Sequence, residues 1–198
     1  HTVRIPVIGI DLDRFKPGRK YERTGDIFRV VSVGELNQNK NHQVVIKAIN
    51  LLNDKNIQYD IYGKGDGKER LEKMIAEYHM NDQVHLRGYV NDTRSVLYNA
   101  DCFVFPSLFE GLGIVAIEAQ CSGLPVVGSD VIPKEAAVTN QFHYMSLDDL
   151  ADAWAKKILE VSKQERKAEI DKIRAAGYDV HDVAEYLQDF YIKKHLEN

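Results

Sequence analysis

Two carboxylates eight positions apart, Glu110 and Glu118, are the residues of this sequence best placed to do chemistry. Gly111 and Gly113 lie between them, and an apolar run that ends at Pro106 precedes them. This order predicts a buried strand, a glycine-rich loop and then a helix. The first turn of a helix presents unpaired N–H groups and a positive dipole end, which suit a phosphate. At about 1.5 Å per residue, Glu118 should lie roughly 8 Å along the helix, within reach of the ribose of a bound nucleotide. The spacing therefore suggests a nucleotide-sugar site.

The composition excludes several other classes of protein. The 198 residues are 44% hydrophobic and 28% charged, enough for one well-packed core. A net charge of −4 argues against a general nucleic-acid binder. Cys102 and Cys121 lie in apolar patterns without a C-x-x-C spacing, so we expect reduced core residues in a cytoplasmic protein.

Strand and helix patterns alternate along the chain, which predicts an α/β fold with a Rossmann-like parallel sheet and helices on both faces. Ser146 should cap one of the later helices, with Asp149 at its third position. Two further helices, broken near Gly177, are expected in residues 163–198. The expected strands cover residues 27–33, 57–62, 84–87, 103–105 and 126–127, and the clearest helical patterns cover 44–52, 67–78 and 147–161.

Residues 110–118 resemble the E-x7-E segment of the retaining glycosyltransferases of the two-Rossmann-domain (GT-B) type, family 4. Many members of that family build bacterial capsular or exopolysaccharide. Other segments follow in the family's order. Residues 34–42 are similar to G-R-L-x-x-x-K-G, 86–90 to F-L-G-x-V, and 122–127 to G-x-P-V-V. The resemblance implies that this chain is the C-terminal, donor-binding half of a larger enzyme.

The resemblance implies roles for the residues around the two glutamates. Glu110 would lie against the donor sugar, and Glu118 would bind the ribose. The backbone amides of Gly111, Leu112 and Gly113 would hold phosphate. Taken alone, Glu110 is better read as a turn residue and Glu118 as a solvated helix residue. Their spacing, after the strand and before residues 122–127, favours the site.

Lys40 matches the family lysine that grips the diphosphate, where a point charge would stabilise the departing nucleotide. Glu35, next to Gly34, stands where the family usually has an arginine, so one of two usual cations is absent. Lys64, in the glycine-rich loop that begins at Gly63, is the candidate to replace it. The plainer alternatives are a solvated lysine at position 40 and an ordinary turn after Gly63.

Tyr89 and Val90 follow the segment whose backbone meets the nucleobase in the family, and their alternative role is to close a loop. His42 is a weaker candidate for phosphate than Lys40, because a histidine at the start of a helix can equally well cap it or face water. Asp11 and Asp13 form a D-x-D pattern, but they precede every core strand, and no cluster of oxygen ligands completes a metal site. We therefore expect no metal and no other cofactor.

The resemblance also implies a domain organisation. Residues 9–17 are similar to the family's interdomain segment, G-V-D-x-x-x-F-x-P, so residues 1–26 are expected to be linker and domain entry. Residues 27–180 would form the donor-binding domain, and 181–198 a helix that crosses to an N-terminal domain absent from this sequence.

The implied reaction transfers a sugar, with retention, from a nucleotide diphosphate to a polysaccharide or lipid-linked acceptor. UDP is the family's commonest nucleotide. The enzyme would work in the cytoplasm or at the inner face of the membrane, and the isolated chain should bind nucleotide yet transfer no sugar. A nucleotide-sugar epimerase of the same fold and a non-catalytic nucleotide-binding module remain as alternatives. The donor sugar, nucleobase, acceptor and linkage are not determined.

Overall fold

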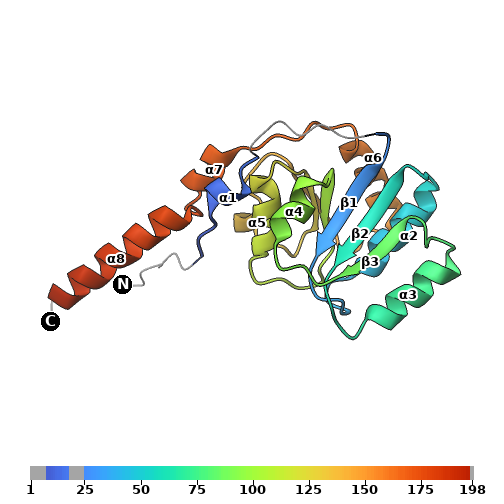
Figure 1. The fold of residues 1–198 in the computed structure, drawn as a ribbon, viewed down its shortest axis with the longest axis horizontal. Coiled ribbons are helices and arrows are strands. Elements are labelled where there is room, and N and C mark those ends of the chain that lie inside the picture. Colours follow the sequence, from blue (N-terminus) through green and yellow to red (C-terminus); the bar gives the residue numbers. More distant parts are fainter. Residues whose placement is uncertain (1–7, 18–24, 197–198) are drawn as a thin grey trace.

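A computed structural model describes residues 8–17 and 25–196, and its centre is one open parallel sheet. The strand order is β3-β2-β1-β4-β5-β6, so the direction of winding reverses between β1 and β4. Figure 1 shows β1, β2 and β3 side by side. This confirms the predicted α/β, Rossmann-like architecture, in which ligands bind outside the carboxyl ends of the strands at that reversal. The strands are β1 (Phe28–Val33), β2 (Ile57–Tyr62), β3 (Val84–Gly88), β4 (Cys102–Phe105), β5 (Val126–Ser129) and β6 (Phe142–Met145).

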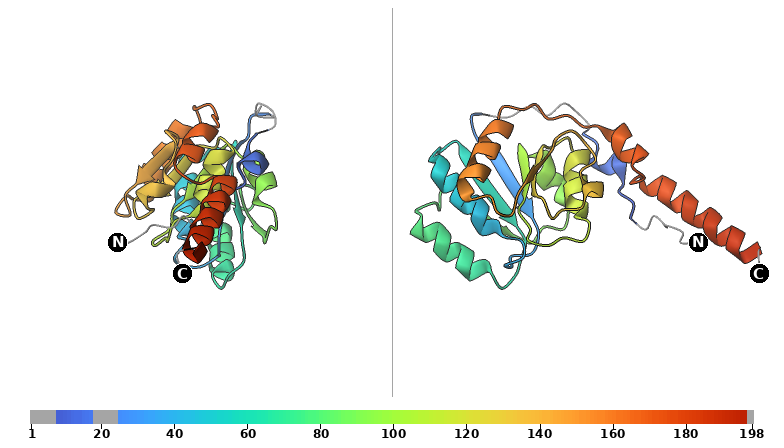
Figure 2. Two further views of the ribbon diagram at one scale, coloured as in Figure 1. Left: turned by 90° about the vertical axis from the view of Figure 1, so that its left-hand side faces the viewer. Right: turned by 180° about the vertical axis from the view of Figure 1, so that it is seen from behind.

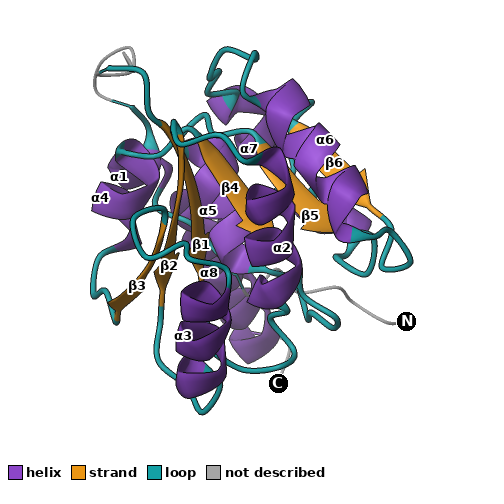
Figure 3. Cartoon of the chain, turned by 90° about the vertical axis from the view of Figure 1, so that its right-hand side faces the viewer, coloured by secondary structure: helices purple, strands orange, loops and turns teal. Residues whose placement is uncertain are grey.

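Helices cover both faces of the sheet, and each face has its own hydrophobic cluster. Val30 of β1 packs with α2, α3 and α6, whereas the next residue, Val31, packs with α1, α4 and α5. Figure 3 shows α2 and α6 on one side of the sheet and α1 and α4 on the other. Successive side chains of a strand point to opposite faces, so apolar runs are needed where both faces are buried. The helices are α1 (Leu12–Phe15), α2 (His42–Leu52), α3 (Lys68–Glu77), α4 (Thr93–Tyr98), α5 (Ile114–Cys121), α6 (Ala151–Val161), α7 (Ile170–Ala175) and α8 (Val180–Leu196), with a 3₁₀ turn, η1 (Lys134–Ala136).

The expected start of α6 was wrong. The helix begins at Ala151, and the residue before it makes no side-chain cap. Ser146 and Asp149 instead close a turn ahead of the helix, where the Ser146 amide donates to Asp149 Oδ2 at 2.9 Å and the Asp148 amide donates to Ser146 Oγ at 3.2 Å. Strand β6 was not among the predicted strands; it is an edge strand whose first three residues are only half-buried.

The two cysteines lie in the core as free thiols, as expected. Burial raises the pKa of Cys102 and raises that of Cys121 to about 12. Both side chains are therefore protonated and unreactive at neutral pH.

Helix α8 extends away from the body of the domain (Figures 1 and 2). Ile10 lies beside the start of this helix: its amide donates to Tyr178 O at 2.7 Å and its carbonyl accepts from the Val180 amide at 3.0 Å. Large apolar side chains stay exposed along α8, among them Tyr186, Tyr191 and Ile192. No helix in the described part of the chain combines the length and the apolar character that a membrane-spanning segment needs.

Candidate functional site

The loops that follow β1 and β2 lie against each other at the carboxyl edge of the sheet. The Gly34 amide donates to Tyr62 O at 3.0 Å, and the Leu36 amide donates to Lys64 O at 2.9 Å. A Cβ atom added to Gly63 would lie 1.8 Å from Gly34 O, so this close approach of two backbones requires glycine. The Gly63 amide donates in turn to Gly88 O at 2.8 Å, which adds the end of β3 to the same assembly.

The loop after β4 is tied to the loop after β1 by two hydrogen bonds. The Leu108 amide donates to Asn39 O at 2.7 Å, and Asn39 Nδ2 donates to Phe109 O at 2.9 Å. These bonds hold the two loops at the point where the strand order reverses. They bring Lys40 and Glu110, which are 70 positions apart in the sequence, into contact.

Lys40 and Glu110 form an ion pair, with Lys40 Nζ 2.6 Å from Glu110 Oε2. Their side chains are only 20% and 17% exposed, so water screens the pair less than it would on the open surface. The Lys40 amide donates to Asn37 Oδ1 at 3.0 Å, and Lys40 Nζ lies 5.2 Å from the centre of the Phe105 ring. The structure thus places a fixed cation and a fixed carboxylate beside the start of α5.

Gly113 is the N-cap residue directly before helix α5, and its backbone has φ of 80°. A Cβ atom there would lie 2.6 Å from the Phe105 ring, so both the backbone conformation and the available space require glycine. The Gly111 amide donates to Glu110 Oε1 at 3.3 Å, and Leu112 is half-buried against the α5 side of the core. The predicted phosphate-holding amides therefore lie next to the ion pair.

Glu118 lies five residues beyond Gly113, about 7.5 Å along the helix at the usual rise. Thr93, the first residue of α4, donates its hydroxyl to Glu118 Oε2 at 3.1 Å. Partial burial raises the pKa of the Glu118 carboxyl. Thr93 was absent from the predicted site, and no sequence pattern pointed to it.

Four of the other predicted residues lie at the same edge but outside the ion pair. Lys64 Nζ lies 5.6 Å from the centre of the Tyr89 ring, and Tyr89 is 65% exposed. Val90 is half-buried and packs on the α5 side of the core. Glu35 is exposed and accepts a hydrogen bond from Asn37 Nδ2 at 2.8 Å.

The expectation for His42 was wrong, because this side chain neither caps a helix nor faces water. It is 3% exposed, with Nδ1 3.2 Å from the Tyr59 hydroxyl and Nε2 3.4 Å from Glu35 O. The Tyr59 hydroxyl lies 2.6 Å from Ser32 Oγ. Burial lowers the pKa of His42 to about 4, so the ring is neutral at physiological pH. Its contact with Glu35 O helps to hold the turn at Glu35 in place.

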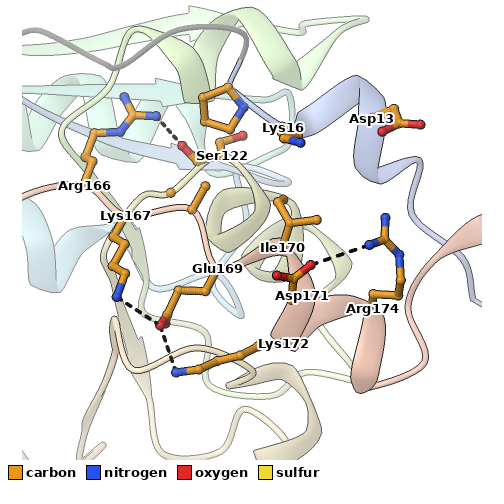
Figure 4. Close-up of a pocket in the computed structure, with 13 residues that line it drawn as sticks. Asp13, Lys16, Ser122, Arg166, Lys167, Glu169, Ile170, Asp171, Lys172 and Arg174 are labelled. Carbon is orange, nitrogen blue, oxygen red and sulfur yellow. Dashed lines mark hydrogen bonds and ion pairs between the residues drawn. The ribbon is translucent and has the colours of Figure 1, made fainter.

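A cavity of about 670 Å³ opens at the other end of the sheet (Figure 4). Several of its charged side chains are paired with one another or with backbone. Arg166 donates to Ser122 O at 2.6 Å, and Glu169 pairs with Lys172 at 2.9 Å and with Lys167 at 3.7 Å. None of the predicted donor-binding residues lines this cavity.

Of the D-x-D pattern, Asp13 lines that cavity, and Asp11 caps α1, where its side chain accepts from the Arg14 amide at 2.9 Å. Within residues 8–17 and 25–196, no three His, Cys, Asp or Glu side chains gather in a way that could hold a metal ion.

Comparison with known proteins gives a consistent result. Residues 14–179 match the family model "Glycosyl transferases group 1". The chain is 30% identical over 185 residues to the putative glycosyltransferase EpsF of Bacillus subtilis (strain 168), covering 86% of this chain and 48% of EpsF. It is 28% identical over 137 residues to the putative colanic acid biosynthesis glycosyltransferase WcaL of Escherichia coli (strain K12), covering 64% of this chain and 34% of WcaL.

Solved structures share the fold. The pneumococcal O-GlcNAc transferase GtfA, solved in complex with UDP and GlcNAc, superposes with a TM-score of 0.78 at 23% identity. The match covers 99% of this chain and 40% of GtfA. The chain thus spans half or less of the length of these proteins.

Proposed function

Since this chain belongs to the group 1 glycosyl transferases, we propose that it is the donor-binding half of a retaining, family 4-like enzyme that uses a UDP-linked sugar. The observation that carries the proposal is the Lys40–Glu110 ion pair beside the start of α5, with Glu118 farther along the same helix. Lys40 and the start of α5 lie where they can meet a diphosphate, and Glu118 lies farther along the helix, where it can meet the ribose. This is the order of the two groups in a nucleotide-sugar.

Each residue has a distinct part in the proposed reaction. Lys40 and the amides of Gly111 and Gly113 bind the diphosphate and stabilise the charge that develops as the bond from sugar to phosphate breaks. Glu110 orients the donor sugar by accepting hydrogen bonds from its hydroxyls. Glu118 accepts hydrogen bonds from the ribose. The nucleotide-sugar is a substrate, and the scheme needs no metal or other cofactor.

Retention follows if the acceptor attacks on the face that the diphosphate leaves. The acceptor oxygen then bonds to the anomeric carbon, the bond from that carbon to the phosphate oxygen breaks, and the acceptor proton passes to the departing phosphate. Glu110 is a poor candidate for a covalent nucleophile, because its carboxylate is already engaged by Lys40 at 2.6 Å.

The proposal extends to the rest of the enzyme. Residues 1–26, of which 1–7 and 18–24 lie outside the described residues, serve as linker and entry, and residues 27–180 bind the donor. The C-terminal segment from residue 181, which contains most of α8 and of which 197–198 lie outside the described residues, crosses to an N-terminal domain that binds the acceptor. The exposed Tyr186, Tyr191 and Ile192 of α8 support that crossing. The name of WcaL, in colanic acid biosynthesis, supports a polysaccharide or lipid-linked acceptor, handled in the cytoplasm or at the inner face of the membrane.

The proposed ribose contact is tested by Glu118→Ala. Loss of hydrogen bonds to a charged group should weaken UDP binding by roughly 1–3 kcal/mol, measured by isothermal titration calorimetry. The circular dichroism spectrum should stay unchanged. Unaltered affinity in a folded variant would remove Glu118 from the ribose site.

Sugar transfer separates the proposal from an epimerase and from a non-catalytic binding module. We expect transfer from a UDP-sugar only when an N-terminal domain is joined to this chain, and nucleotide binding without transfer by the 198 residues alone. Comparable transfer by these residues alone would contradict the two-domain proposal. Interconversion of the free UDP-sugar would instead favour the epimerase.

A further inference from the structure

One hydroxyl outside the predicted site touches the proposed ribose carboxylate. Thr93 Oγ1 donates to Glu118 Oε2 at 3.1 Å, and this contact joins the first turn of α4 to the middle of α5. Glu118 is half-buried, so a hydrogen bond to its charged form offsets part of the cost of burying that charge.

Thr93 itself is held in place by the start of α4. Asp92 caps this helix, and its Oδ1 accepts from the Arg94 amide at 3.0 Å. Asp92 also pairs with the Arg94 guanidinium at 2.6 Å and with Arg14 of α1 at 3.4 Å. Thr93 therefore directly follows Asp92, a capping residue that is held by ion pairs with arginines of both α4 and α1.

A glutamate side chain has several rotatable bonds, and fixing them costs conformational entropy. With Oε2 engaged by Thr93, the side chain is restricted to the rotamers that keep this bond. Oε1 then remains to accept from another donor. A carboxylate fixed before the ligand arrives loses less entropy when it binds.

We propose that Thr93 is a positioning residue. It holds the Glu118 carboxylate in the orientation that accepts hydrogen bonds from the ribose hydroxyls of the nucleotide. This inference rests on the proposed role of Glu118. It assigns to the start of α4 a part in recognition of the ribose, separate from the phosphate contacts of the loops after β1 and β4.

The test measures binding of UDP and of 2′,3′-dideoxy-UDP to this chain by calorimetry. Thr93→Val removes the hydroxyl and keeps the shape, and it should weaken UDP binding about 3- to 10-fold. The same variant should bind the dideoxy nucleotide with the affinity of wild type, because that ligand lacks the hydroxyls that donate hydrogen bonds to Glu118. Thr93→Ser restores the donor and should recover most of the affinity for UDP.

Ser95→Ala is the matched control. It removes a hydroxyl from the same turn of α4, one that donates to Asp92 O at 3.2 Å and does not touch Glu118. It should leave both affinities unchanged. Equal losses for the two nucleotides in Thr93→Val, or a loss of the same size in Ser95→Ala, would reduce Thr93 to a structural residue and overturn the inference.

A double variant separates this inference from the proposed function. In the Glu118→Ala background, Thr93→Val should have no further effect on UDP binding. If Glu118→Ala alone leaves UDP binding intact, the ribose role of Glu118 fails and the inference falls with it. If Glu118→Ala weakens binding while Thr93→Val does not, only the positioning role is wrong.

Discussion

The two ends of the sheet both carry charged side chains, but they use them differently. At the carboxyl end, Lys40 and Glu110 pair at 2.6 Å from two loops that meet where the strand order reverses. At the amino end, Arg166 donates to the carbonyls of Tyr98, Ala100 and Ser122 at 3.0, 2.7 and 2.6 Å.

The partners differ in whether a ligand can replace them. The three carbonyls belong to the backbone at the end of α4, before β4 and after α5, so they must stay paired for the fold to persist. Glu110 is a side chain, and a diphosphate presents the same kind of acceptor to Lys40 with more charge. The amino end has the cavity of about 670 Å³, yet the carboxyl end has the exchangeable charges. The presence of a cavity therefore does not by itself identify a ligand site.

The largest effect should come from Arg166→Ala, which tests whether the amino end is structural. Loss of charge-assisted hydrogen bonds to three carbonyls should lower the free energy of unfolding by about 3–4 kcal/mol, measured by urea denaturation. UDP affinity should not change. Lys163→Ala, at an exposed position of the same segment, should cost less than about 0.5 kcal/mol. Weaker UDP binding by folded Arg166→Ala would place the amino end in the functional site.

The carboxyl end also contains a structural residue, His42, and its effect should depend on pH. Burial lowers its pKa to about 4, whereas an unfolded histidine titrates near about 6.5. Between these pH values His42 is protonated in the unfolded chain but not in the native state. The free energy of unfolding therefore falls as the pH falls. The contribution of His42 is complete above about pH 6.5, and up to about 3 kcal/mol is lost by about pH 4.

Denaturation of His42→Asn across this range should show a shallower loss of stability than wild type. His79→Asn is the control, because His79 is exposed at φ of 56°, a conformation that asparagine tolerates. This control should follow the wild-type curve. Identical curves for wild type and His42→Asn would show that His42 does not titrate in this way.

A smaller effect, and the opposite of the usual loss, is expected for Glu110→Gln. Removing the carboxylate frees Lys40 for phosphate, so UDP should bind about 3- to 10-fold more tightly while uridine binding stays the same. Asp66→Asn removes a charge from an exposed position of the neighbouring loop after β2, and should change UDP affinity much less. Weaker UDP binding by Glu110→Gln would mean that Lys40 and Glu110 act together on the nucleotide instead of competing.

Sequence patterns predicted the five strands from β1 to β5, because runs such as Val30-Val31 must be apolar when both faces of the strand are buried. They failed at α6, where Leu147 and Leu150 continued the apolar pattern. Both side chains are exposed, Leu150 by 75%, whereas Trp154 and Ile158 enter the core. Local periodicity does not report which apolar residues the rest of the fold will cover.

For the candidate site too, the sequence predicted some features and not others. Glycine positions and the order of motifs placed Lys40, Glu110 and Glu118 at one edge, since loops after neighbouring parallel strands meet there. Their partners depended on tertiary packing: the ion pair across 70 positions, and the Thr93 hydroxyl 25 positions from Glu118. His42 was misjudged for this reason too, because its burial depends on Tyr59 and the Glu35 turn.

In the proposed function, Lys40 binds the diphosphate of the donor at the carboxyl edge of the sheet. The most direct measurement compares UDP with uridine on wild type and on Lys40→Ala by isothermal titration calorimetry. A lost charged contact should weaken UDP binding about 10- to 100-fold and leave uridine binding within about 2-fold of wild type. Equal losses for UDP and uridine, or no loss for either, would contradict this account.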